Sequence, residues 1–335
     1  MTKLGKYEKY LIEEFFDDYR AGAMSQGTFT RRVAFITGSM AAASAAMLLV
    51  GCTPDEVPRG TDPMPTPSPS PSGPGTGTGN APGPATGTAA LRPVPGAKSP
   101  LSVPEGEPGL VTETVRFPAD GTDISAYLAR PASGAAGPAV LICHENRGLT
   151  AHIEDVARRF AKAGYAALAL DLLSREGGTA TMDRDAVPGA LTAAGAQRHV
   201  SDFAAAFDCL QSKDFVAEGR IAMNGYCFGG GITWQAATEL PGLKATAAFY
   251  GPSPDLEKVP AIKPAVFGVY AELDQRITGA LPALREALAA TNVRHQLTVY
   301  PGVDHAFHND TGDRYVEAQA TAAWNDTLAW FARYV

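Results

Sequence analysis

The sequence predicts an α/β domain with a mainly parallel sheet covered by helices on both faces. From residue 139 onward, short apolar runs alternate with helical patterns, which is typical of parallel strands buried between helices. An antiparallel hairpin pattern precedes this alternation. Polar residues with catalytic chemistry follow several strand patterns, as they do at the carboxyl edge of an open α/β sheet.

The elements are expected in the following order. Residues 112–117 and 124–130, joined through Asp120-Gly121, have the pattern of a hairpin at the edge of the sheet. Buried strands are expected over residues 139–143, 166–170, 221–224, 245–250, 265–270 and 296–300. Helices are expected over residues 153–163, 200–211, 230–240, 281–290 and 316–333. We expect no separate lid domain.

Composition limits the function classes. The 335 residues are 45% hydrophobic and 19% charged, enough for one domain of ordinary core size with extra segments. The net charge of -7, without a basic run in the main body, argues against a nucleic-acid partner. The four cysteines, at positions 52, 143, 209 and 227, have no metal-site spacing, so we expect no zinc site. The reaction expected below needs no metal and no cofactor.

Residues 1–52 have the features of an export signal outside the fold. Arg31 and Arg32 lie in a stretch that resembles a twin-arginine signal, and an uncharged, Ala-rich segment follows. Its ending, Leu49-Val50-Gly51-Cys52, resembles a lipobox. The alternative is a transmembrane anchor, although Ala, Gly, Ser and Thr insert weakly. We therefore expect an exported protein anchored to a membrane by a lipid on Cys52. Residues 10–19 could form a short amphipathic helix.

Residues 53–104 are expected to be a disordered linker. Half of the 26 prolines fall within residues 53–100, between Thr, Ser and Gly, and such a composition cannot bury a core. A spacer is the favoured interpretation, and a ligand for proline-binding modules is the alternative. The catalytic domain is then expected over residues 105–335.

The stretch Gly225-Tyr-Cys-Phe-Gly-Gly230 lies between a predicted strand and a predicted helix. Strand, sharp turn with flanking glycines and helix are the context of the nucleophile elbow of α/β-hydrolases, here with Cys227 where serine is usual. Side chains at Gly225 and Gly229 would collide across such a turn. The following helix N-terminus favours a thiolate. Cys227 is therefore the candidate nucleophile.

In this fold the acid and the histidine follow the nucleophile in that order. Asp274 follows the strand predicted at 265–270, and His305 follows the strand at 296–300. We expect His305 to act as the base and Asp274 to orient it. His308 is the alternative histidine. Asp304 is the alternative acid, although neighbouring side chains in an extended segment point apart.

These motifs together resemble the dienelactone hydrolase family, the cysteine-dependent branch of the α/β-hydrolases. The resemblance covers about residues 105–335 and also rests on Cys143-His-Glu-Asn-Arg-Gly-Leu149, Asp171-Leu-Leu-Ser-Arg175 and Tyr250-Gly251. It implies that Glu145 contacts the thiol and takes its proton, and that Arg175 binds a substrate carboxylate. The backbone N–H groups of Phe228 and Asn146 would form the oxyanion hole.

One position departs from the family pattern. The family carries a second arginine four residues after the catalytic histidine, and this chain has Asn309 there. A strongly acidic substrate is therefore in doubt. Tyr250 could line the substrate pocket, with an aromatic core role as its alternative, and so could Trp234. Cys143 and Cys209 are expected to be packing residues, with a disulfide between them as the minority alternative.

The expected function is hydrolysis of a small-molecule ester or lactone through an acyl-thioester on Cys227. The first alternative is a broader esterase or thioesterase that acts on neutral substrates. The second is a non-catalytic binding protein that keeps the fold, and the third is a surface lipoprotein whose tether matters most. Retention of Cys227, Asp274 and His305 together favours an enzyme. A monomer is favoured.

Overall fold

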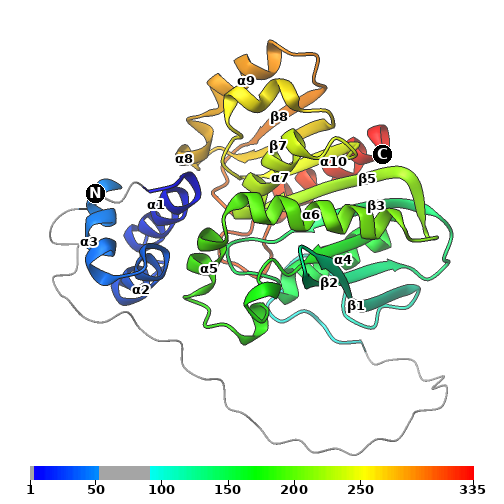
Figure 1. Cartoon of the computed structure of the whole chain (residues 1–335), viewed down its shortest axis with the longest axis horizontal. Coiled ribbons are helices and arrows are strands. Elements are labelled where there is room, and N and C mark those ends of the chain that lie inside the picture. The colour runs from blue at the N-terminus through cyan, green and yellow to red at the C-terminus, as the bar shows by residue number, and fades with distance from the viewer. Residues whose placement is uncertain (1–3, 53–90) are drawn as a thin grey trace, which may run out of the picture.

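The computed structural model describes residues 4–52 and 91–335. Its centre is an eight-stranded sheet with the strand order β1-β2-β4-β3-β5-β6-β7-β8 (Figure 1). The strands are β1 (Leu110–Ala119), β2 (Thr122–Pro131), β3 (Gly137–Cys143), β4 (Ala166–Leu170), β5 (Val216–Tyr226), β6 (Ala245–Phe249), β7 (Ala265–Ala271) and β8 (His295–Tyr300).

The expected edge hairpin is present. β1 and β2 pair antiparallel, and the turn residues Asp120 and Gly121 have φ values of 46° and 77°. Two consecutive left-handed residues suit a tight hairpin turn. β2 also pairs antiparallel with β4, whereas the remaining neighbours are parallel. The carboxyl ends of β3 to β8 therefore share one edge of the sheet.

Helices cover both faces of the sheet, as predicted. α6 (Ala196–Gln211) and α7 (Phe228–Glu239) pack together on one face, which is the near face in Figure 1. α4 (Ala151–Lys162) and α10 (Glu317–Tyr334) cover the other face, where the rings of Phe160 and Trp324 lie 4.5 Å apart. The other helices of this region are α5 (Val187–Ala194), α8 (Gln275–Thr278) and α9 (Leu281–Ala289), with short 3-10 turns η1 (Ser174–Glu176), η2 (Thr179–Thr181) and η3 (Leu256–Ala261).

The N-terminal segment differs from the expectation that it lies outside the fold. It forms three helices, α1 (Lys6–Arg20), α2 (Gln26–Thr37) and α3 (Met40–Leu49), drawn in blue in Figure 1. The amphipathic helix expected over residues 10–19 is thus confirmed as part of α1. Leu11, Ile12 and Phe15 are almost fully buried and join the same hydrophobic cluster as the catalytic region. Burial of this apolar face is what holds the segment on the domain.

The linker also differs from expectation at its end. Arg92 and Glu105 form an isolated antiparallel bridge, and the N–H of Val103 donates to the buried carboxylate of Asp155. Residues 91–104 are therefore ordered against the domain, because buried polar partners fix their backbone. The rest of the predicted linker, residues 53–90, lies outside the described residues.

No single helix in the described ranges is both long and apolar enough to cross a membrane. α2 and α3 taken together have sufficient length and composition, but their axes are bent by 102°.

Candidate active site

Cys227 lies at the sharp turn between β5 and α7, where the sequence predicts the elbow. Its backbone has φ 56° and ψ -119°, which is strained for a residue with a side chain. Its N–H donates to the carbonyl of Phe249 at 3.0 Å, which fixes the turn against β6. The side chain is thereby held at the carboxyl edge of the sheet, at the start of α7.

The two glycines of the elbow are required by close backbone approach. A Cβ at Gly225 would lie 2.2 Å from the carbonyl oxygen of Gly229. A Cβ at Gly229 would lie 2.4 Å from the carbonyl oxygen of His144 on the loop after β3. Both distances are far below van der Waals contact, so the predicted collision is confirmed.

His305 and Asp274 meet at the same edge. Nδ1–H of His305 donates to Oδ2 of Asp274 at 2.6 Å, and both side chains are almost fully buried. Asp304 instead accepts from the backbone N–H of His305. The hydrogen bond to Asp274 leaves Nε2 of His305 facing the thiol, and donor atoms of His305 and Cys227 lie within 4.8 Å of each other.

Two backbone N–H groups are available beside the thiol. Phe228 is the first residue of α7, and Asn146 follows β3 by three residues. Within the described part of the chain, neither amide N–H has a hydrogen-bond acceptor. The arrangement can therefore receive an oxyanion next to Cys227.

Glu145 lies in the cleft beside Cys227, but another carboxylate contacts the thiol. Oε2 of Glu145 accepts a 2.6 Å hydrogen bond from the side chain of Asn309. The carboxylate of Glu14, on α1, lies 3.5 Å from Sγ of Cys227 through Oε2. Glu14 also accepts from the side-chain amide of Asn146 at 2.9 Å.

Tyr10 of α1, like Glu14, reaches the thiol although the sequence did not predict it. The hydroxyl of Tyr10 donates to Sγ of Cys227 at 3.3 Å and lies 3.5 Å from Nε2 of His305. The amphipathic pattern of residues 10–19 indicated that this segment packs against something. It gave no sign that the partner is the elbow.

Charge and burial set the protonation of this cluster. Burial lowers the pKa of His305, but the carboxylates of Glu14 and Asp274 outweigh burial and raise that pKa well above its ordinary value. Burial and the negative charge of Glu14 raise the pKa of the Cys227 thiol, against the opposing effect of His305. Burial raises the pKa of Asp274, but His305 outweighs it and the net pKa is lowered. With α1 in place, a neutral thiol therefore faces a protonated imidazole.

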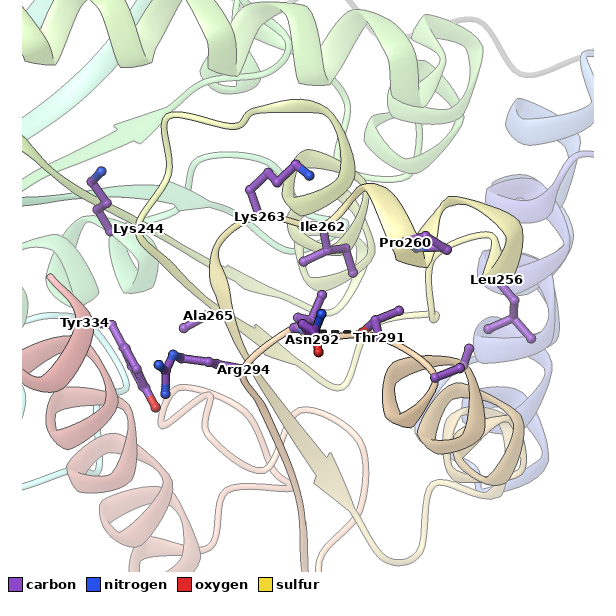
Figure 2. A pocket seen from close by; sticks show the side chains of 13 residues that line it. Lys244, Leu256, Pro260, Ile262, Lys263, Ala265, Thr291, Asn292, Arg294 and Tyr334 are labelled. Atoms are coloured by element: carbon purple, nitrogen blue, oxygen red, sulfur yellow. Dashed lines mark hydrogen bonds between the residues drawn. The ribbon is translucent and has the colours of Figure 1, made fainter.

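A cleft of about 690 Å³ opens beside these groups and is lined by Cys227, His305, Glu145 and Asn309, with one wall made by α1. A larger hollow, of about 790 Å³, lies elsewhere. Figure 2 shows it lined by Lys244, Ala265 and Arg294, which lie at the amino ends of β6, β7 and β8. This hollow lies at the amino ends of the strands, whereas Cys227 lies at their carboxyl ends. The smaller cleft is therefore the candidate active site.

Arg175 and Tyr250 are not among the residues that line this cleft. The guanidinium of Arg175 donates to the buried carboxylate of Asp202 at 2.6 Å and to the carbonyl of Ala119 at 2.9 Å. Tyr250 is fully buried and its ring packs edge-on against that of His305, with centres 4.9 Å apart. Trp234 is likewise buried in α7.

The remaining candidates have packing roles. His308 is buried and stacks on Tyr226, with ring centres 5.0 Å apart. Burial and the neighbouring Arg159 lower its pKa well below the ordinary value. Cys143 and Cys209 are free thiols, the first buried and the second half-buried, so the alternative disulfide is not formed.

Glu14, Cys227 and His305 could together hold a metal ion. One oxygen, one sulfur and one nitrogen from these side chains all lie within 4.8 Å of one another. This donor set is of the kind that zinc accepts. Two of the three donors are the predicted nucleophile and its base, so an ion there would compete with covalent chemistry at the thiol.

Comparisons with known proteins agree with this geometry. The model of the dienelactone hydrolase family matches residues 124–335. A carboxymethylenebutenolidase homologue from Salmonella typhi is 34% identical over 255 residues, covering 72% of this chain and 93% of that protein. A homologue of the same name from Methylorubrum extorquens is 33% identical over 239 residues, covering 68% of this chain and 82% of that protein.

A solved structure shows the same similarity. The crystal structure of a dienelactone hydrolase homologue from Klebsiella pneumoniae has a TM-score of 0.63 and 30% identity, covering 67% of this chain and 99% of that one. The parallel sheet, the elbow and the sequence matches lead to one conclusion. The chain belongs to the dienelactone hydrolase family of the α/β-hydrolases and is a hydrolase that acts on carboxylic ester or lactone bonds.

Proposed function

We propose that the chain hydrolyses its ester or lactone through an acyl-thioester on Cys227. The observation that carries this proposal is the meeting of Cys227, at a strained elbow, with the His305–Asp274 pair, joined at 2.6 Å. A thiolate is the nucleophilic form of cysteine, and a histidine within reach is the usual means of forming it.

The reaction proceeds in two halves. His305 takes the proton of the thiol, and Sγ of Cys227 forms a bond to the carbonyl carbon while the C=O electron pair moves to oxygen. The N–H groups of Phe228 and Asn146 hold the resulting oxyanion. The tetrahedral intermediate collapses, the C–O bond breaks, and His305 returns its proton to the leaving oxygen.

The second half restores the enzyme. His305 takes a proton from water, and the hydroxide attacks the thioester carbon. The C–S bond breaks, the acid product leaves, and the thiol regains its proton. Asp274 keeps Nδ1 of His305 protonated throughout, so that Nε2 remains the atom that exchanges the proton.

The charge of the substrate divides the two candidate functions. Asn309, bonded to Glu145, favours a neutral ester or thioester. Arg147, Arg276 and Arg314 line the same cleft and favour an acidic substrate. A panel of acidic and neutral esters and lactones, tested with wild type, Cys227→Ala and Cys143→Ala, separates these cases. We expect Cys227→Ala to lose turnover on the preferred set and Cys143→Ala to retain it. Turnover by Cys227→Ala would overturn the thioester mechanism.

We also infer that residues 1–52 direct export and that Cys52 carries a lipid. The support is the Arg31-Arg32 pair and the Leu-Val-Gly-Cys ending at Cys52. Metabolic labelling with a fatty acid, in wild type and Cys52→Ala, tests the anchor. If Cys52→Ala still carried the label, the proposal that Cys52 carries the lipid would be wrong. Replacing Arg31 and Arg32 by lysine should block export, and unaffected export would contradict the twin-arginine route.

A further inference from the structure

We propose that helix α1 is an inhibitory segment, which closes the active site through Tyr10 and Glu14 until the N-terminal helices α1–α3 are displaced or cut away. This inference rests on the proposed nucleophile Cys227. It adds a role for helix α1 itself to the export role proposed for residues 1–52.

The first argument is steric. Attack requires the substrate carbon to come within about 3–3.5 Å of the sulfur before the bond forms. The hydroxyl oxygen of Tyr10, at 3.3 Å, and the carboxylate of Glu14, at 3.5 Å, already lie in that shell. Cys227 is only 2% exposed. An ester cannot occupy the same space while α1 is seated.

The second argument is electrostatic. The carboxylate of Glu14 lies 3.7 Å from Nε2 of His305 and is also the acceptor of the Cys227 thiol. Negative charge at this point favours a protonated imidazole and disfavours a thiolate. A protonated His305 cannot take the thiol proton. The same side chain that fills the space above the sulfur therefore also holds the pair in its unreactive protonation state.

The third argument is that α1 is docked by ion pairs at the cleft. Asp17 pairs with Arg276 and Asp18 with Arg314, each at 2.9 Å. Both arginines line the cleft that contains Cys227. Burial of Glu14 raises its pKa, but the neighbouring His305, Arg276 and Arg314 outweigh burial and lower it, so its carboxylate stays ionised in this position. The charges of α1 are thus complementary to those around the elbow.

The fourth argument is that α1 belongs to a unit with contacts of its own. The ring of Phe29 in α2 stacks on Phe16 and Tyr19 of α1, with centres 5.9 and 5.4 Å apart. α3 in turn packs against α2, so the three helices can leave together. The predicted cleavage in front of Cys52, by a lipoprotein signal peptidase, would remove α1, α2 and α3 in one step and open the cleft.

The test uses the full chain with a site-specific protease sequence inserted within residues 53–90, so that the protein folds before it is cut. A tethered segment has a high effective concentration, which cutting removes. On dilution after cutting, we expect both ester turnover and iodoacetamide labelling of Cys227 to rise about tenfold or more, since only the open fraction reacts. Added peptide of residues 4–52 should reverse both effects.

Point variants provide a second arm without cutting. Asp17→Asn with Asp18→Asn loosens α1 and should raise turnover and Cys227 labelling in the uncut chain. Glu13→Gln, on the same helix but paired with Lys9 alone among the residues that the structure describes, at 3.6 Å, should match wild type in both readouts. Melting temperatures identify any variant that has lost its fold.

The readouts separate the two claims. Labelling that rises without turnover supports the inhibitory segment and overturns the proposed catalysis. High turnover and labelling in the uncut chain, unchanged by cutting and dilution, overturns the inhibitory segment alone. Loss of turnover on cutting also overturns it, because α1 would then contribute to the reaction.

Discussion

The hydroxyl of Tyr10 lies 3.3 Å from Sγ of Cys227, although 217 positions separate the two residues in the sequence. Between them lie residues 53–90 and about half of the predicted catalytic domain. The contact places the N-terminal helix at the atom where we propose that the reaction begins. It relates the state of the N-terminus to the chemistry of the thiol.

Asp274 rather than Asp304 should be the acid that supports His305. Asp274→Asn removes the charged partner of Nδ1 and should lower kcat/KM by about 10²- to 10⁴-fold. Asp304→Asn is the matched control, because the carboxylate of Asp304 accepts from the backbone N–H of His305 and not from its imidazole ring. Steady-state kinetics of both variants decide the matter. A larger loss of kcat/KM in Asp304→Asn than in Asp274→Asn would show that Asp304, and not Asp274, supports His305.

The pH dependence of Cys227 labelling should respond to Glu14. Burial and Glu14 raise the pKa of the thiol, so the thiolate forms only at a pH above its ordinary range. Glu14→Gln removes the negative charge and should move the midpoint of the iodoacetamide rate profile to lower pH. Glu13→Gln, at a half-buried position of the same helix that pairs with Lys9, should leave the midpoint in place. A midpoint that stays fixed or rises in Glu14→Gln contradicts the electrostatic role.

Gly225→Ala should be strongly destabilising. Its Cβ would lie 2.2 Å from a backbone oxygen and 2.3 Å from Oγ1 of Thr233, so the elbow must shift. We expect a loss of about 1–3 kcal/mol in the free energy of unfolding, as for other overpacked sites. Gly27→Ala, an exposed helical position with no neighbour within 4 Å, serves as the control. Similar urea midpoints for the two variants would show that the elbow is not closely packed.

Arg175→Ala should act on stability rather than on substrate charge. The variant leaves the carboxylate of Asp202 buried without its guanidinium partner, at a cost of about 1–3 kcal/mol. Arg198→Ala breaks the partly exposed pair with Glu176 and should cost about 0–1 kcal/mol. Urea unfolding measures both losses. A selective rise in KM for acidic substrates in Arg175→Ala would restore its family role in anion binding.

The meeting of Cys227, Asp274 and His305 at one edge of the sheet was predictable because each residue has a local signal. Cys227 lies in a glycine-flanked turn, and Asp274 and His305 follow strands whose carboxyl ends share an edge of the sheet. The position of Arg175 was not predictable in the same way. The guanidinium of Arg175 points toward Asp202, its partner on α6. No sequence motif relates the positions of these two residues.

The docking of α1 was beyond sequence reasoning for a related reason. The Arg31-Arg32 pair and the Ala-rich segment that follows indicate a signal, and signals are expected outside the fold. The evidence that α1 docks on the domain is its ion pairs, between Asp17 and Arg276 and between Asp18 and Arg314. The residues of each pair are brought together only by the tertiary structure. A single sequence does not show which distant charges meet.

The most direct test of the central claim is to trap the acyl-enzyme. The chain cut within residues 53–90 is diluted, mixed with an activated ester of the preferred class, quenched in acid and digested for mass spectrometry. We predict that the peptide containing Cys227 carries the mass of the acyl group as a thioester, and that Cys227→Ala carries none. An acyl group on another residue, or turnover without any acylated Cys227 at times before steady state, would contradict the account.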